Sequence, residues 1–170
     1  MVIGIGVIPN TEWLEGSGLE IDNGVLCDET CLAAPNVVAA GDVARWPNRL
    51  FDEVMRVEHW DNAVEQGMYA ARRLLSGESH IDPYTPTPWF WTDQFDRKIQ
   101  LAGRTRPDDE IKIITGSTEE RRFATIYGRE DRLVGILGFN RPRHVMQYKQ
   151  MIADRVSWLD AIAYAEEQAS

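Results

Sequence analysis

Three prolines near the middle of the chain, Pro83, Pro86 and Pro88, limit how the chain can fold. Proline has no amide hydrogen and a fixed φ, so neither a helix nor an inner strand can run through this stretch. A segment with helical periodicity comes before it, and a series of short β-type segments follows. The sequence therefore predicts two domains, residues 1–83 and 84–170.

The first half contains one strongly periodic segment, residues 58–75. Apolar residues recur in it at steps of three and four, and Gly77 follows as a helix stop. This spacing predicts an amphipathic helix. Its apolar positions are Trp60, Ala63, Val64, Gly67, Met68, Ala71, Leu74 and Leu75.

Short apolar runs in the first half predict buried strands. The Asn23-Gly24 pair favours a tight turn with positive φ, so the runs on either side of it should form a small hairpin. Another run ends on Gly41-Asp42, which places a carboxylate at the end of a strand. The predicted strands of this half are residues 2–7, 19–21, 25–27 and 37–40.

The second half changes from strands to helices along its length. Gly, Asp and Pro clusters separate its β-type runs, which indicates an antiparallel sheet, and the polar residues 128–131 predict a hairpin turn. Helical spacing follows from Val145 to Ile152, and Ser157 is placed to cap a second helix. The predicted strands are residues 89–92, 98–102, 111–114, 122–127 and 132–139.

The charge and hydropathy patterns exclude several classes of function. The formal net charge is −9 without any basic cluster, which argues against a nucleic-acid partner. No apolar run reaches the roughly 18 residues of a membrane span, and no signal peptide is evident. We therefore expect a cytoplasmic protein that does not enter a membrane.

The two cysteines, Cys27 and Cys31, are interpreted as ordinary reduced thiols. No helix start beside them would lower a thiol pKa, and the three histidines do not give a zinc spacing, so no metal site is predicted. A redox pair, as in a disulfide reductase, is the alternative. The acidic groups 108–110 and 119–120 are interpreted as solvated turns.

Two features could bind a ligand. Gly41 permits a close approach of the backbone, and the Asp42 carboxylate could accept hydrogen bonds from sugar hydroxyls, although an Asp at this position can also simply cap a turn. Trp89 and Trp91 alternate with Phe90 on a predicted strand, so both indoles face one side. They could form either an aromatic wall for a ligand or part of the core.

Four ordered segments carry a resemblance to a known family. Residues 4–11 (GIGVIPNT), 36–43 (NVVAAGDV), 56–67 (RVEHWDNAVEQG) and 88–94 (PWFWTDQ) resemble segments of the bacterial ferredoxin reductases that serve dioxygenases and cytochromes P450. These enzymes are a branch of the pyridine nucleotide-disulfide oxidoreductase superfamily. The resemblance extends over essentially the whole chain.

The resemblance implies positions for an FAD cofactor, with no side chain acting as a catalytic acid or base. Asp42 would bind the ribityl hydroxyls, the Val43 amide would lie near the pyrophosphate, and Glu58 would lie near the nicotinamide edge. The tryptophans would lie beside the flavin ring, with packing as the alternative for Trp60 and Trp89. The implied cofactor-binding residues are Gly41, Asp42, Val43, Glu58, Trp60, Trp89 and Trp91.

The implied activity is electron transfer from NAD(P)H through FAD to a ferredoxin-type iron–sulfur protein. The implied fold is α+β: the C-terminal remnant of an FAD-binding α/β domain, then an antiparallel-sheet interface domain with C-terminal helices. No Gly-x-Gly-x-x-Gly fingerprint follows a strand, so we expect a C-terminal portion that binds FAD weakly or not at all by itself. The alternative is a non-catalytic interaction or dimerisation module. Apolar faces in residues 2–7 and 58–75 would be exposed, which favours a homo-oligomer.

Overall fold

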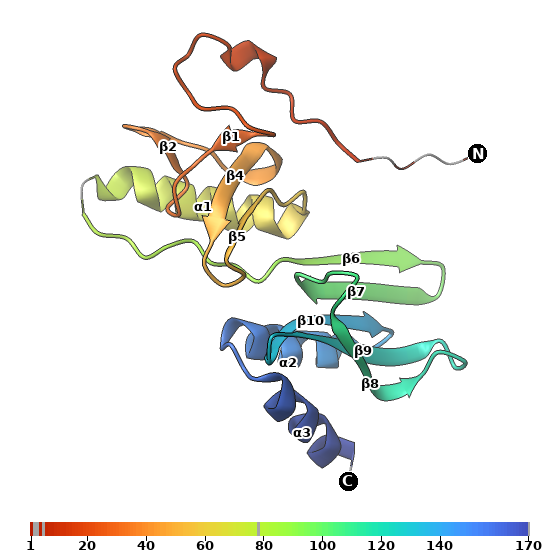
Figure 1. The fold of residues 1–170 in the computed structure, drawn as a ribbon. Coiled ribbons are helices and arrows are strands. Elements are labelled where there is room, and N and C mark those ends of the chain that lie inside the picture. The colour runs from red at the N-terminus through yellow and green to blue at the C-terminus, as the bar shows by residue number, and fades with distance from the viewer. Residues whose placement is uncertain (2–3, 5, 78, 170) are drawn as a thin grey trace. The chain divides into compact units, whose positions relative to one another are not determined.

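The computed structural model describes residues 1, 4, 6–77 and 79–169, and it divides into unit 1 (residues 1–85) and unit 2 (residues 86–170) (Figure 1). Unit 1 combines short strands with one long helix. Unit 2 is an antiparallel sheet followed by two helices. The predicted α+β fold class is confirmed.

Unit 1 contains two small sheets, two short helical turns and one helix. A three-stranded sheet has the order β1-β4-β5, in which β1 is parallel to β4 and β4 is antiparallel to β5. A separate hairpin joins β2 and β3. The elements in chain order are η1 (Glu12–Leu14), β1 (Val25–Leu26), β2 (Leu32–Ala34), β3 (Val37–Val38), η2 (Gly41–Val43), β4 (Ala44–Asn48), β5 (Glu53–Met55) and α1 (Trp60–Ser76).

Strand β4 forms the centre of the unit 1 core and was not predicted. Ala44, Trp46 and Asn48 are buried, and the residues between them are only partly buried, which is the two-residue alternation of a strand. The Trp46 ring lies 5.5 Å from the Tyr84 ring, and its Nε1 donates to the Tyr84 carbonyl oxygen at 3.1 Å. The segment that leaves unit 1 is therefore fixed to this core.

Of the strand predictions in unit 1, the one for residues 2–7 was wrong where the structure describes it, and the one for residues 37–40 was right only in part. Residues 2, 3 and 5 of the first lie outside the described residues, while Gly4, Gly6 and Val7 are exposed and belong to no strand. Val37 and Val38 do form β3, but Val37 is 38% exposed. Among the described strands β3 pairs only with β2, so it is an edge strand; Val38 packs against the unit 1 core, and Val37 stays partly exposed.

The predicted turn at Asn23-Gly24 is confirmed. Both residues have positive φ, 50° and 126°, and an antiparallel bridge joins Ile21 to Val25. Beyond that bridge the hairpin does not continue as a ladder. Strand β1 pairs instead in parallel with β4.

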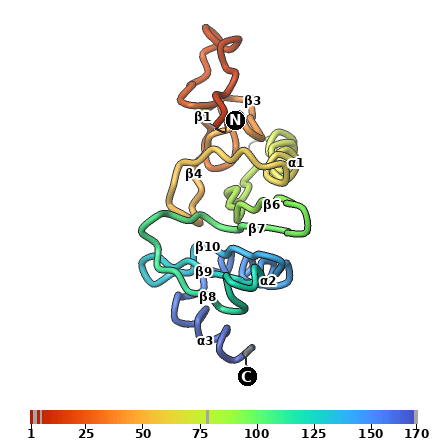
Figure 2. Tube along the Cα trace, turned by 90° about the vertical axis from the view of Figure 1, so that its right-hand side faces the viewer, coloured from red at the N-terminus to blue at the C-terminus, as the bar shows by residue number. Residues whose placement is uncertain are grey.

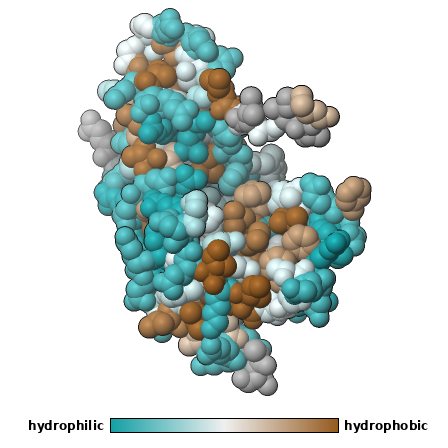
Figure 3. All heavy atoms as spheres, turned by 45° about the vertical axis from the view of Figure 1, so that its right-hand side comes forward, coloured by the Kyte–Doolittle hydropathy of each residue, from teal (hydrophilic) through white to brown (hydrophobic). Residues whose placement is uncertain are grey.

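Helix α1 confirms the predicted helix, but its buried face is mainly polar. Asn62 and Gln66 are buried against unit 1, whereas Trp60, Val64 and Met68 are 73%, 43% and 53% exposed. The apolar stripe therefore points away from the unit 1 core, and polar side chains fill the buried face instead. Apolar groups interrupt an otherwise polar surface in the space-filling view (Figure 3).

Unit 2 follows the sequence prediction closely. Its sheet has the order β6-β7-β10-β9-β8 with all neighbours antiparallel, and Glu130 and Asp131, both with positive φ, turn β9 into β10. All five predicted strands and both helices are present. Their bounds are β6 (Trp89–Gln94), β7 (Arg97–Gly103), β8 (Glu110–Ser117), β9 (Arg122–Arg129), β10 (Arg132–Phe139), α2 (Pro142–Ala153) and α3 (Trp158–Ala169).

Glycines allow the two helices to approach the sheet of unit 2. A Cβ at Gly138 would lie 2.3 Å from a Val145 methyl carbon of α2, and one at Gly128 would lie 2.4 Å from the Trp158 ring of α3. Helix α2 packs along β10 and β7, and α3 contacts β8 and β10 (Figure 2). In the core of unit 2, helix side chains thus pack directly against the backbone of the strands at these glycines.

The prediction that residues 108–110 are solvated holds for Asp108 and Glu110, which are exposed, but was wrong for Asp109. The Asp109 side chain is fully buried and binds Arg129 through both carboxylate oxygens, with distances of 2.7 and 2.9 Å. Asp109 also accepts the Arg106 amide at 2.6 Å. A run of acidic residues predicts an exposed turn unless a distant cation pairs with one of them. The partner of Asp109 is Arg129, which lies 20 positions away in the sequence, so the local pattern does not show the pair. Glu119 and Glu120 are exposed, as predicted.

Within the described residues, no helix combines the length and the apolar character that a membrane crossing needs.

Candidate functional site

The turn η2 is the centre of the candidate site in unit 1. Gly41 has φ +74°, a conformation that side-chain-bearing residues rarely adopt. A Cβ at this position would also lie 3.3 Å from the Ala63 methyl carbon on α1. Glycine is therefore needed here both for the backbone conformation and for the close packing of the turn on the helix.

Gln66 of α1 fixes this turn by a hydrogen bond to its main chain. Its side chain is fully buried, and its Oε1 accepts the Gly41 amide at 2.8 Å and the Asn62 Nδ2 at 3.3 Å. Its Nε2 lies 3.5 Å from the Cys31 sulfur. Sequence reasoning did not single out Gln66, because a polar residue on a helix is usually exposed.

The Asp42 carboxylate is exposed and available to a ligand. Within the described residues it makes no hydrogen bond or ion pair, so it does not cap its own turn. Its backbone carbonyl, in contrast, accepts Arg56 Nη1 at 3.0 Å. The turn is thus fixed through its main chain, while the acidic group is left free.

Arg56 links the predicted site residues of unit 1. Besides the Asp42 carbonyl it binds the Glu58 carboxylate, with Nη1 2.5 Å from Oε1. The Val43 carbonyl oxygen would lie 2.6 Å from a Cβ at Gly24, so Gly24 permits the turn to pack there. Arg56 and Gly24 therefore bring together four predicted site residues, Gly41, Asp42, Val43 and Glu58. The sequence analysis gave Arg56 no role of its own and gave Gly24 only a role in a turn.

Trp60 is the first residue of α1, and its side chain is 73% exposed. It contributes little to the unit 1 core. Of the two interpretations of Trp60, packing in the core of unit 1 is therefore not supported.

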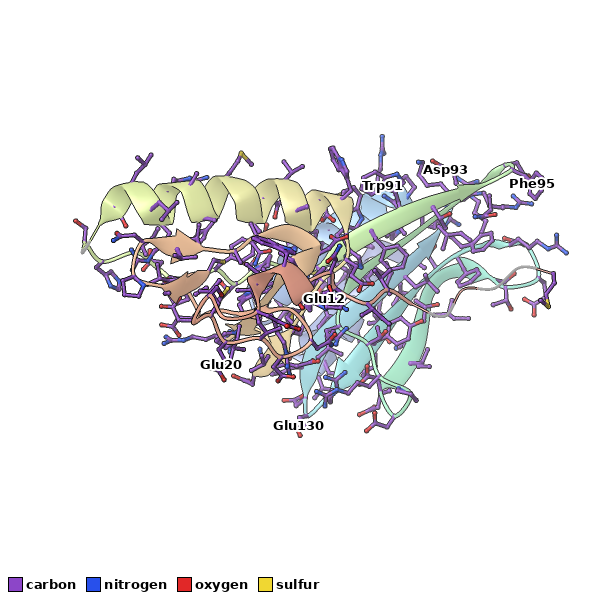
Figure 4. The ribbon with its side chains drawn as sticks, turned by 90° about the horizontal axis from the view of Figure 1, so that it is seen from above. Glu12, Glu20, Trp91, Asp93, Phe95 and Glu130 are labelled. Carbon is purple, nitrogen blue, oxygen red and sulfur yellow. The ribbon has the colours of Figure 1, made fainter. Side chains whose placement is uncertain are left out.

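Trp89 and Trp91 form an aromatic pair on one face of β6. Their ring centroids lie 4.7 Å apart with an interplanar angle of 30°, and Trp91 is 38% exposed (Figure 4). Lys149 of α2 places its Nζ 5.3 Å from the centroid of the Trp89 ring. The pair is therefore a half-open aromatic surface supported from α2, and Trp91 is not a core residue.

The buried Nε1 of Trp89 has no hydrogen-bond partner among the described residues. A buried donor without an acceptor is unfavourable by about 1–3 kcal/mol, so such a group indicates a missing partner. A ligand with a ring carbonyl or ring nitrogen would supply one. Taken by themselves, the Trp89 donor and the flat Trp91 face of unit 2 suit a flavin ring, and the free Asp42 carboxylate of unit 1 suits a hydroxylated chain, so the residues of each unit fit a part of FAD.

The two cysteines are unsuited to redox chemistry near neutral pH. Cys31 is fully buried and Cys27 is 6% exposed, and burial raises the pKa of Cys27 to about 11 and of Cys31 to about 12. A thiol must ionise to act as a nucleophile or metal ligand. In the described part of the chain, no group of His, Cys, Asp or Glu is suited to hold a metal ion.

Comparison with known proteins defines the class. Residues 89–169 match the family described as reductase C-terminal, and residues 1–67 match the pyridine nucleotide-disulphide oxidoreductase family. The first match covers the sheet and helices of unit 2. The second covers the η2 turn and the first half of α1. The chain is therefore similar, over both matched ranges, to oxidoreductases of the pyridine nucleotide-disulphide class.

Individual relatives narrow this class. The chain is 36% identical to putidaredoxin reductase of Pseudomonas putida, over 92% of its own length and 36% of that protein. It is also 36% identical to rhodocoxin reductase of Rhodococcus erythropolis, over 90% and 35% of the two lengths. The solved covalent complex of putidaredoxin reductase with putidaredoxin matches with a TM-score of 0.79 at 36% identity, over 89% of this chain and 36% of that one. The chain belongs to the ferredoxin reductase family.

Proposed function

We propose that the protein to which this chain belongs transfers electrons from NAD(P)H through FAD to a ferredoxin-type iron–sulfur protein. The chain spans only about a third of its relatives, 36% and 35% of the two named above. The activity of the whole protein is therefore inferred from them. The observation that carries the proposal is the η2 turn, fixed through Gly41 and Arg56, with the Asp42 carboxylate left free. We place the reaction in the cytoplasm, where NAD(P)H is available.

The residues of unit 1 would bind the sugar-phosphate side of the cofactor. Asp42 would accept hydrogen bonds from the ribityl hydroxyls, and the Val43 amide would face the pyrophosphate. Glu58, held by Arg56, would lie at the nicotinamide edge, and Trp60 would lie near the flavin ring. When bound, FAD would supply the change from two-electron to one-electron transfer.

The residues of unit 2 would provide the aromatic wall. Trp91 offers an exposed flat face, and Trp89 offers an N–H donor to an acceptor on the ring system. The named relative structure is a complex of a reductase with its putidaredoxin partner, which supports a small iron–sulfur protein as the electron acceptor.

Replacing Asp42 by alanine is expected to weaken FAD binding by roughly 10- to 100-fold, because hydrogen bonds to a charged group contribute about 1.5–3 kcal/mol. The measurement is an NMR titration of this chain with FAD, following the Val43 amide and the Trp89 and Trp91 indoles. At millimolar FAD even weak binding gives saturable shifts. Asp42→Asn keeps an acceptor oxygen and should lie between the two.

Glu12→Ala is the matched control for that titration, because Glu12 is an exposed acid outside the turn. It should bind FAD like the unmodified chain. The proposal fails if the unmodified chain shows no saturable FAD-dependent shift at these groups.

A second candidate function is a non-catalytic interaction or dimerisation module. The exposed apolar stripe of α1 favours it, since Trp60, Val64 and Met68 together present a row of solvent-facing apolar side chains. Such a module would associate with itself and show no response to FAD. The same titration therefore separates the two candidates.

We propose that copies of this chain associate through the α1 stripe, and Met68→Glu is expected to reduce that association at least about tenfold by placing a charge in it. Sedimentation equilibrium over a wide concentration range measures the effect. Arg72→Glu changes the charge of an exposed position on the same helix and should associate more strongly than Met68→Glu. An unmodified chain that stays monomeric at its highest soluble concentration would refute the homo-oligomer.

A further inference from the structure

We propose that Gln66 is a positioning residue, which sets the orientation of the Gly41–Val43 turn so that Asp42 faces the cofactor. The inference rests on the proposed function of that turn. It concerns a residue that would not contact the cofactor and would act through the main chain of Gly41.

Gln66 is unusual because it is a long polar side chain with no exposed surface. Burying an amide is unfavourable unless its polar atoms find partners. Gln66 satisfies this condition at both ends: Oε1 accepts two hydrogen bonds, from Gly41 at 2.8 Å and Asn62 at 3.3 Å, and Nε2 lies 3.5 Å from the Cys31 sulfur. The shorter bond is the one made to the turn.

The orientation of the Gln66 amide is fixed by its neighbours. Asn62 donates to the Val57 carbonyl at 3.3 Å as well as to Gln66, and its own Oδ1 accepts the Tyr84 hydroxyl at 3.2 Å. An exchange of oxygen and nitrogen at Gln66 would place donors against Asn62 and Gly41. The oxygen therefore has to face the turn, and a chain of hydrogen bonds runs from Tyr84 through Asn62 and Gln66 to the Gly41 amide.

The consequence for the turn is that the Gly41 amide points into unit 1. Gly41 is buried while the next residue, Asp42, is exposed. With φ +74° at Gly41 the backbone reverses between these two residues, so the bond to Gln66 determines which residue faces inward. Without it, glycine could adopt many other conformations at this point, and the Asp42 carboxylate would lose its fixed direction.

A purely structural role for Gln66 would be to fill space in the unit 1 core. Gln66→Met tests this alternative, because methionine has nearly the same length and shape but cannot accept the Gly41 amide. Gln66→Glu is the conservative counterpart, since a buried glutamic acid is favoured in its neutral form and keeps an acceptor oxygen for Gly41.

Two measurements on the full chain test the inference. The first is the hydrogen-exchange rate of the Gly41 amide, compared with the slowest amides of unit 1, and the second is FAD affinity by the NMR titration above. We expect Gln66→Met to accelerate Gly41 exchange roughly tenfold relative to those amides and to weaken FAD binding by a similar factor. Gln66→Glu should restore most of both.

A core variant that leaves the turn untouched supplies the control. Met55 is 2% exposed, and Met55→Ala should lower the unfolding midpoint while leaving FAD affinity unchanged. The inference is overturned if Gln66→Met retains both Gly41 protection and FAD affinity, or if Gln66→Glu loses them to the same extent as methionine.

Failure of the inference can be told apart from failure of the proposed function. An unmodified chain that does not respond to FAD contradicts the proposed function, and with it the purpose assigned to the turn. Normal FAD binding together with unchanged Gly41 exchange in Gln66→Met contradicts the inference alone.

Discussion

Replacing Gly103 by alanine is expected to destabilise unit 2 by about 3–5 kcal/mol, the sum of backbone strain and overpacking. Gly103 ends β7 with φ +94°, and a Cβ there would lie 2.1 Å from the Val134 carbonyl oxygen and 2.8 Å from the Gly135 Cα. Both contacts are with backbone of β10, the central strand of the sheet. No side-chain rotation can relieve them, so β7 and β10 would have to separate locally.

Urea unfolding followed through the NMR signal of the Trp158 indole measures this loss, because Trp158 is buried within unit 2. The control is Gly67→Ala on α1, where a Cβ meets nothing within 4 Å. That substitution should stabilise unit 1 by about 0.5–1 kcal/mol through the better helix propensity of alanine. Equal unfolding midpoints for Gly103→Ala and the unmodified chain would show that β7 does not pass so close to β10.

Removing the Asp109 carboxylate is the second change with a large expected effect, about 3–5 kcal/mol for Asp109→Ala. The ion pair between Asp109 and Arg129 is buried: the Asp109 side chain is fully covered, and the Arg129 side chain is 17% exposed. Alanine would remove the carboxylate that pairs with this cation and the acceptor of the Arg106 amide hydrogen bond. An uncompensated buried charge is more unfavourable than the loss of a surface ion pair.

The comparison that makes this prediction specific is Asp93→Ala. Asp93 pairs with Lys98 at 2.8 Å, but the two side chains are 59% and 45% exposed. Exposed pairs contribute about 0–1 kcal/mol, so this variant should unfold almost like the unmodified chain. If Asp109→Ala and Asp93→Ala have the same unfolding midpoint, the Arg129 pair is not shielded from water.

The strands and helices of unit 2 could be predicted from sequence because local features mark where most of them begin and end. Gly, Asp and Pro clusters separate its strands, residues 128–131 turn directly from one strand to the next, and Ser157 caps α3 by accepting the Asp160 amide at 3.1 Å. Each of these features involves neighbours along the chain. Sequence patterns of this kind report local geometry directly.

The parts that the sequence did not predict depend on distant partners. Asp109 looked like a surface acid until Arg129 was seen to reach it, and β4 was missed although its alternation was present at Ala44, Trp46 and Asn48. The face of α1 that packs on unit 1 was also unexpected. Its buried positions are polar because the groups they meet there, a backbone amide and a thiol, are polar too.

The candidate site also contains both kinds of residue, those that a local sequence pattern predicts and those that depend on distant partners. Asp42 was identified because an acid after a small-residue strand is a local pattern, and the structure leaves its carboxylate free. Gln66 and Arg56, which hold the turn from 25 and 14 positions away, carry no local signal of that role. Residues that contact a ligand can often be read from a motif, whereas residues that position a motif require the fold.

The central claim is that both units of this chain belong to one FAD-dependent reductase. The most direct test replaces the matching segment of Pseudomonas putida putidaredoxin reductase with residues 1–170 and measures flavin absorbance in the purified hybrid, with and without Asp42→Ala. The account predicts a yellow hybrid that retains FAD and a colourless Asp42→Ala version of it. A folded hybrid that cannot be loaded with FAD, or one whose FAD content is unaffected by Asp42→Ala, would contradict the account.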